Sequence, residues 1–254
     1  MIVKIRLDSV YSVSKDPERH ELNEDAFDRD IEGCVFALSD GASESYDSQT
    51  WARMLVHKYV ENPSFTGEWV SDVQQNYQAS VDFNSLSWSK QLAFERGSFA
   101  TLLGLKVLNE GRIVDVLSIG DSLAVHIRDG ICIRSFPFQH PEQFDARPEL
   151  LATLRHQNKF TQDDQFMISD HSEKWDLMIG DQIFMLTDAI GQWFLRELNY
   201  EIGSFEALSK VTTEIEFQSL ILAMRGEKRM KLDDSTMLRF IVESAGTRDG
   251  VPEH

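Results

Sequence analysis

The sequence predicts an α+β domain, in which helices and antiparallel strands form separate layers. Residues with helical spacing gather at 51–95 and 205–224, whereas strand-like runs follow one another through short turns over 98–136. Such a meander is typical of antiparallel pairing, because parallel strands need a crossover helix between them. The chain has 254 residues, 42% of them hydrophobic and 26% charged, which suits one globular domain.

The N-terminal half begins with strands and continues into helices. Residues 1–8 alternate charged and apolar side chains and predict a strand, whereas residues 10–32 are polar and irregular. Residues 33–39 form an apolar run that predicts a buried strand, closed by the turn dipeptide Asp40-Gly41. Two helical stretches follow, with large apolar residues every three or four positions: Trp51, Met54, Leu55 and Tyr59, then Trp69, Val73, Tyr77 and Val81.

The C-terminal half is built mainly from strands. Runs rich in Leu, Val and Ile, separated by turn residues, predict strands at 99–108, 113–119, 123–128, 131–136, 182–187 and 236–242, with a helix over 205–224. Residues 137–180 are polar, contain three prolines, and predict a long irregular excursion. We therefore expect one domain over 1–243 and a disordered polar tail over 244–254.

Composition excludes several classes of protein. The formal net charge is −17, which repels nucleic-acid phosphates and anionic lipid, so we expect neither as a partner. No apolar run is long enough to span a bilayer, and the N-terminus lacks a signal-peptide core, so we expect a cytoplasmic protein. Cys34 and Cys132 lie in apolar runs and are expected to be buried free thiols, too few for a disulfide framework or a zinc-thiolate site.

Four aspartates stand at the ends of predicted strands. Asp40, Asp121 and Asp188 each follow an apolar run, and Asp233 precedes one. Strand ends at one edge of a sheet bring distant residues together, and converging carboxylates are the ligands that Mg²⁺ and Mn²⁺ prefer. Aspartate also favours ordinary turns, as at Asp129-Gly130, so the pattern alone leaves a structural role open for each residue.

The order of these acids and their neighbours resembles the metal-dependent protein phosphatases, the type 2C serine/threonine phosphatases. The matching segments are Asn23-Glu24-Asp25-Ala26, Phe36–Gly41, Gly97–Thr101, Ser118–Ser122, Asp181–Asp188 and Asp233–Thr236, in family order. The resemblance implies a four-layer α-β-β-α sandwich with two central antiparallel sheets, and residues 137–180 fall where the family carries a variable flap.

The resemblance also implies a centre of two Mg²⁺ or Mn²⁺ ions, with a third ion in many bacterial members. Asp40 would bridge the two metals and the Gly41 carbonyl would serve one of them, with Glu24 and Asp25 beside it. The first metal would be held by Asp188 and Asp233, and the third by Asp121 together with Asp188. A metal-bound water would then hydrolyse phosphoserine or phosphothreonine in a protein substrate.

The chain departs from the family pattern in three places. The usual phosphate-binding arginine is replaced by His20, with Arg19 one position earlier, so both are candidate catalytic contacts. Ala42-Ser43-Glu44 replaces a glycine-rich continuation, and Ala189 replaces a glycine. Two functions stay open: a phosphatase, by analogy opposing a protein kinase, or a pseudophosphatase that binds phosphoproteins. Hydrolysis of small phosphate esters would use the same centre.

Other polar and aromatic residues have ordinary explanations. Residues of the excursion that are able to contact substrate, or simply to face solvent, are His140, Asp163, Asp164, Asp170 and His171. Core packing is expected for Trp69, Trp88 and Trp193.

Overall fold

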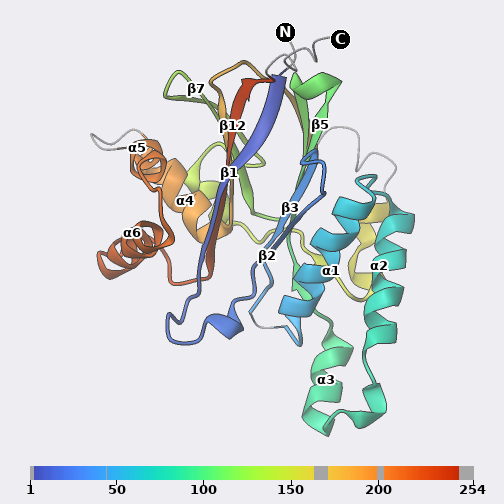
Figure 1. The fold of residues 1–254 in the computed structure, drawn as a ribbon. Coiled ribbons are helices and arrows are strands. Elements are labelled where there is room, and N and C mark those ends of the chain that lie inside the picture. Colours follow the sequence, from blue (N-terminus) through green and yellow to red (C-terminus); the bar gives the residue numbers. More distant parts are fainter. Residues whose placement is uncertain (1–2, 44, 163–170, 199–202, 246–254) are drawn as a thin grey trace, which may run out of the picture.

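The computed structural model describes residues 3–43, 45–162, 171–198 and 203–245. Two five-stranded antiparallel sheets lie face to face at its centre (Figure 1). In order across the first sheet lie β1 (Val3–Val13), β12 (Ser235–Ser244), β11 (Gln182–Leu186), β7 (Leu123–Arg128) and β8 (Ile131–Phe136). In the second lie β10 (Ser172–Asp176), β6 (Ile113–Ile119), β5 (Leu102–Leu108), β3 (Val35–Ser39) and β2 (Ala26–Arg29).

Helices cover the outer faces of both sheets, which completes the predicted four layers (Figure 1). The second sheet is covered by α1 (Ser48–Glu61) and α2 (Gly67–Ser80), and the first by α4 (Asp188–Glu197), α5 (Ser204–Ser209) and α6 (Glu214–Gly226). Figure 1 shows α3 (Trp88–Arg96) away from both sheets, whereas a small sheet of β4 (Phe99–Ala100) and β9 (Leu151–Ala152) joins the core beneath α1 and α2. Short 3₁₀ helices are η1 (His20–Leu22), η2 (Phe83–Ser85), η3 (Asn109–Gly111), η4 (Pro141–Asp145), η5 (Arg155–Gln157) and η6 (Lys159–Gln162).

Strand alternation explains why the central strands read as continuous apolar runs. In β3, Phe36 and Leu38 point into the core between the sheets, whereas Val35 and Ala37 pack under α1 and α2. In β11, Ile183 and Met185 point into the core between the sheets, whereas Phe184 and Leu186 pack under the helices of the first sheet. Because both faces of these strands are covered, all positions but the first of β11 are buried, and the sequence shows no polar alternation.

The structure corrects several details of the sequence prediction. The irregular segment 10–32 contains the end of β1 and all of β2, and the helical stretch 205–224 is two helices, α5 and α6. The helical region 51–95 contains a third helix, α3, beyond the two predicted stretches, and the excursion 137–180 contributes β9 and β10. Ser244 belongs to β12, and the remainder of the predicted tail beyond residue 245 lies outside the described residues.

Burial confirms two of the three tryptophan predictions. Trp69 and Trp193 are 3% and 2% exposed, but Trp88 is 75% exposed because it starts α3, a helix with no buried residue. Cys34 and Cys132 are free, as predicted, yet only partly buried; Cys132 lies on the edge strand β8. Of the helices in the described part of the chain, none is both long and apolar enough to cross a membrane.

Candidate metal centre

Strand pairing brings the predicted acids to one end of the sandwich. β3 and β6 both pair with β5 and end at the same edge, where β2 begins, so Asp25, Asp40 and Asp121 leave the second sheet together. In the first sheet, β11 ends beside the start of β12, which places Asp188 near Asp233. A hydrogen bond of 2.6 Å from Thr236 Oγ1 to Asp25 Oδ2 links the two sheets at this end.

Asp25 is a buried carboxylate with an unsatisfied oxygen. Its Oδ1 is buried and has no hydrogen-bond partner among the described residues. Burial, reinforced by the charges of Asp234 and Asp233, raises the pKa of Asp25 to about 8. A carboxylate in such surroundings takes up a proton or binds a cation.

Asp40 is held through its backbone, which leaves its carboxylate available. Its N–H donates to Thr101 Oγ1 at 2.8 Å, and its carbonyl accepts from the Thr101 N–H at 2.9 Å. Burial, together with the charges of Asp25, Asp233 and Asp121, raises the pKa of Asp40 well above its usual range. Thr101, the last residue of the Gly97–Thr101 segment, therefore positions Asp40.

Glycines let the loops of the centre approach closely. A Cβ on Gly41 would lie 2.9 Å from both the Glu24 carbonyl oxygen and the Ser48 Cβ, so only glycine fits. Gly120, which precedes Asp121, has φ of +101° and packs against Thr101, where a Cβ would come within 2.7 Å. The two glycines thus allow the loops of Asp40 and Asp121 to pack closely against neighbouring segments of the second-sheet half.

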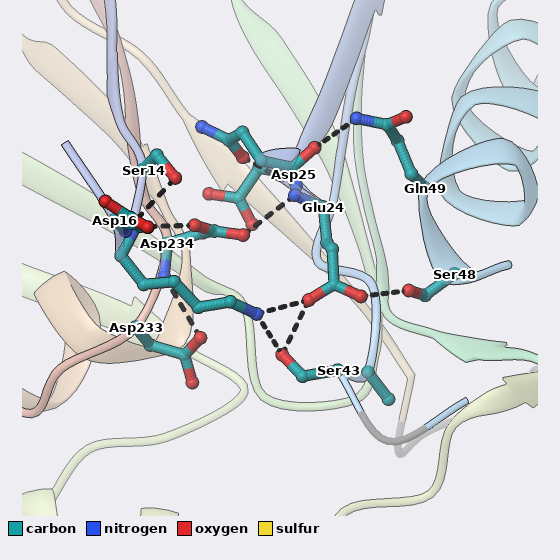
Figure 2. Close-up of polar contacts among 12 residues, drawn as sticks. Ser14, Asp16, Glu24, Asp25, Ser43, Ser48, Gln49, Asp233 and Asp234 are labelled. Atoms are coloured by element: carbon teal, nitrogen blue, oxygen red, sulfur yellow. Dashed lines mark hydrogen bonds and ion pairs between the residues drawn. The ribbon is translucent and has the colours of Figure 1, made fainter. Parts of the chain in front are cut away.

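Glu24 lies in a network of side-chain donors (Figure 2). Its Oε2 accepts from Lys15 Nζ at 2.5 Å and Ser43 Oγ at 2.6 Å, and its Oε1 accepts from Ser48 Oγ. Burial opposes ionisation of this carboxyl, but the bonds to Lys15 and the serines hold the pKa of Glu24 below its usual value. Ser43 belongs to the segment that departs from the family pattern, and it supports Glu24.

Asp234 ties together the two loops that carry this network. Its carboxylate accepts from the backbone N–H groups of Lys15 and Glu24, both at 2.7 Å, and the residue is 2% exposed (Figure 2). Sequence reasoning did not assign Asp234 a role. The available signal was its position beside Asp233, where the resembling family has asparagine.

Asp188 and Asp233 enclose a lysine. Asp188 is the first residue of α4 and is 8% exposed; its Oδ2 binds Lys231 Nζ, while its Oδ1 is buried without a partner in the described chain. Asp233 Oδ2 lies 3.7 Å from the same ammonium group. Burial raises the pKa of Asp121, and the charge of Lys231 opposes that rise. The sequence pattern did not reveal that Lys15 and Lys231 contact predicted metal ligands.

The donor chemistry fits divalent metal, although the acids are not tightly grouped. Within the described ranges, the group of three ligand atoms all within 4.8 Å of one another is Asp30, Glu32 and Cys34, in the turn at the opposite end of β3 from Asp40. In the predicted centre, ammonium groups already contact Glu24 and Asp188. The unpartnered oxygens of Asp25 and Asp188 nevertheless suit a hard cation.

The two candidate phosphate contacts are exposed to solvent. The Arg19 side chain is 59% exposed, and its Nε is 3.7 Å from Glu21 Oε1. His20 is exposed at the start of η1. In the described part of the chain, neither side chain forms a hydrogen bond with a predicted metal ligand.

The predicted flap contributes little to the described centre. His140 caps η4, and His171 Nδ1 lies 3.2 Å from the Ser118 carbonyl oxygen. The other flap candidates, Asp163, Asp164 and Asp170, lie outside the described residues.

Two adjoining pockets flank this region. One, of about 260 Å³, is lined by Lys15 and Glu24 and shares Ser45 and Tyr46 with a larger pocket of about 570 Å³. The larger pocket is lined by three cations and several aromatic residues, including Arg96, Arg147, Lys159, Phe99 and Phe160. These cations form no ion pair within the described structure, although Glu149 also lines the pocket. On a chain of net charge −17, they make a local positive surface.

Comparison with known proteins identifies the fold. No family model matches the chain, and no curated protein matches it. Solved structures do match over nearly the whole chain. The catalytic domain of the serine/threonine protein phosphatase PstP, in complex with two manganese ions, is 16% identical, with a TM-score of 0.57 over 96% of this chain and 99% of that one.

Two other phosphatase structures are similar to the same extent. PppA, a regulatory component of the type VI secretion system (T6SS) in Pseudomonas aeruginosa, is 16% identical, with a TM-score of 0.54 over 95% of this chain and 98% of that one. The photosystem II phosphatase PBCP is 16% identical, with a TM-score of 0.52 over 94% of this chain and 98% of that one. The chain therefore has the fold of the type 2C serine/threonine phosphatases.

Proposed function

We propose that this protein is a member of the metal-dependent phosphatase family that hydrolyses phosphoserine or phosphothreonine in protein substrates. The observation that carries the proposal is the gathering of acids from both sheets at one end of the sandwich, with buried, unpartnered oxygens on Asp25 and Asp188. Oxygens in this state suit a bound cation, and the matching fold of PstP holds two manganese ions.

The carboxylates divide into two sets toward metal. One ion would be held by Asp188 and Asp233, and the other by Glu24, Asp25 and the Gly41 carbonyl. Asp40 would contact both ions, and Asp121 would serve a third, weaker position. Bound Mg²⁺ or Mn²⁺ supplies a Lewis acid for the phosphoryl group and a water of lowered pKa. The chain contributes the positioning: Thr101 fixes the Asp40 backbone, Thr236 orients Asp25, and Asp234 anchors the backbone of Glu24.

We expect the substrate phosphate to bind beside η1. Glu21 and Leu22 of η1 line the same small pocket as Glu24 and Lys15. Arg19 and His20, exposed beside that pocket, are the proposed phosphate contacts. Of the two, a guanidinium offers the phosphate paired donors, whereas imidazole does not.

The test is hydrolysis of an aryl phosphate and a phosphothreonine peptide with Mn²⁺, Mg²⁺ or EDTA. Wild type, Asp188→Asn and Asp176→Asn are compared, because Asp176 lies exposed on β10, away from the centre. We expect turnover that requires metal, is lost in Asp188→Asn and is retained in Asp176→Asn. Absence of turnover in folded wild-type protein with either metal refutes an enzymatic role.

A second function is favoured by the lysines at the centre. Because Lys231 contacts Asp188 and Lys15 contacts Glu24, the fold has cations of its own at two predicted ligands. A pseudophosphatase that binds phosphoproteins without hydrolysing them needs no metal. Binding of a phosphothreonine peptide in EDTA, measured by calorimetry without product formation, would support this alternative.

A further inference from the structure

Lys231 contacts the carboxylates that are proposed to hold the first metal. Its ammonium group binds Asp188 Oδ2 and lies 3.7 Å from Asp233 Oδ2, the two carboxylates proposed to hold that ion. The Lys231 side chain remains 42% exposed, whereas that of Asp188 is only 11% exposed. The lysine therefore reaches inward from the rim to a buried acid.

The loop that carries Lys231 is fixed on both sides of it. Arg229 Nε donates to Glu197 Oε1 at 2.8 Å, and the Glu197 side chain is 5% exposed. Met230 packs in the core under the first sheet, at 5% exposure. These neighbours hold the loop against α4, so the lysine is presented to Asp188 by an anchored segment.

The other side of the loop is fixed by Arg225. Its guanidinium binds the Asp233 carbonyl oxygen and donates to the Ser14 carbonyl oxygen at 2.9 Å. The backbone around Asp233 is thus tied to the end of β1. The lysine and the two acids lie on anchored segments, and their approach does not depend on a freely moving chain.

One carboxylate oxygen cannot bind an ammonium group and a divalent ion in the same place, because the two cations repel each other. We infer that Lys231 is a resident competitor for the Asp188–Asp233 metal position, and that metal enters this position only by displacing the lysine. The lysine keeps the metal-free fold neutralised here and sets a threshold concentration for metal loading. This inference rests on the proposed metal centre.

The test compares Mn²⁺ affinity by calorimetry, and thermal unfolding in EDTA, for wild type, Lys231→Met and Lys228→Met. Lys228 is exposed, lies in the same loop and forms no ion pair in the described structure, so its substitution removes the same charge without the contact. We expect Lys231→Met to bind the first Mn²⁺ about tenfold more tightly, the effect of losing one charged hydrogen bond. In EDTA, it should unfold at a lower temperature than wild type.

The outcomes separate the two proposals. Equal Mn²⁺ affinity of wild type and Lys231→Met, with metal-dependent hydrolysis intact, overturns the competition alone. An equal gain in Lys228→Met also overturns it, because that gain would reflect net charge and not displacement. No Mn²⁺ binding by any variant overturns the competition and the metal centre together. Binding by Lys231→Met but not by wild type supports the competition and assigns the natural protein to the pseudophosphatases.

Discussion

Replacing Asp234 with asparagine tests whether this residue holds the two loops of the centre together. The wild-type carboxylate accepts two backbone N–H groups at 2.7 Å each, from Lys15 and Glu24, at a position that is 2% exposed. Asparagine keeps one acceptor oxygen and turns its NH₂ group toward the second N–H. One charge-assisted bond is lost, and a buried donor is left unpaired.

The magnitude follows from the bond that is lost. A hydrogen bond to a charged acceptor contributes about 1.5–3 kcal/mol. Removing the charge of Asp234 also relieves its repulsion of Asp25, whose pKa it helps to raise, and this offsets part of the loss. We therefore expect Asp234→Asn to lower the free energy of unfolding by about 2 kcal/mol, and the melting temperature by about 4–8 °C for a chain of this size.

The assay is urea unfolding in EDTA, followed by tryptophan fluorescence, with Asp16→Asn as the matched control. Asp16 Oδ1 also accepts a backbone N–H, from Glu18 at 3.1 Å, but that bond is exposed to solvent. The control should lose less than about 0.5 kcal/mol, as is usual for surface substitutions. Equal stability of Asp234→Asn and wild type would refute the anchoring role.

Three further predictions concern pH, substrate choice and phosphate binding. His126 Nε2 lies 2.8 Å from Asp181 Oδ2, and burial lowers the pKa of this histidine. As the pH falls, His126 therefore takes up a proton at a higher pH in the unfolded chain than in the folded protein. Stability should thus fall as pH drops from about 7 to 5, by at most about 1.4 kcal/mol per pH unit, and His126→Gln should show a smaller slope in urea unfolding at both pH values. Arg96 lines the larger pocket with its three cations, so Arg96→Glu should raise KM about two- to fivefold for phosphopeptides with flanking Asp or Glu, but not for neutral ones. Arg53→Glu, at an exposed position on α1, is the control in the same kinetic assay. Arg19→Ala should raise KM for a phosphothreonine peptide about tenfold while His20→Ala changes it little, and equal effects of the two would contradict a guanidinium contact.

The fold was largely predictable because its signals are local. Apolar runs such as 182–187, and helical spacing such as that of Trp51 and Leu55, arise from neighbouring residues and need no knowledge of the partner strand. Where prediction was wrong, tertiary context decided the outcome. β2 has only four residues and just one of them is buried, and Trp88 lies on a helix that has no buried residue.

The candidate centre was predictable only in part. Acids at strand ends carry a recognisable pattern, and the structure brings Asp25, Asp40, Asp121, Asp188 and Asp233 to one end of the sandwich. Lysines carry no such pattern, since most lie on the surface without a specific partner. Only the folded loops reveal that Lys15 reaches Glu24 and that Lys231 reaches Asp188.

The pairing of the first strand with the last has a consequence for biosynthesis. β1 forms its ladder with β12, from Val3 opposite Ser244 to Val13 opposite Ser235, and β12 also separates β1 from the remainder of its sheet. A nascent chain on the ribosome therefore exposes β1 without a neighbouring strand until β12 has been made. Because Glu24 is anchored by Asp234, the centre too is assembled only after that last segment emerges. Folding with such distant contacts is slow, and a chain released early would present an open apolar edge for chaperones to cover.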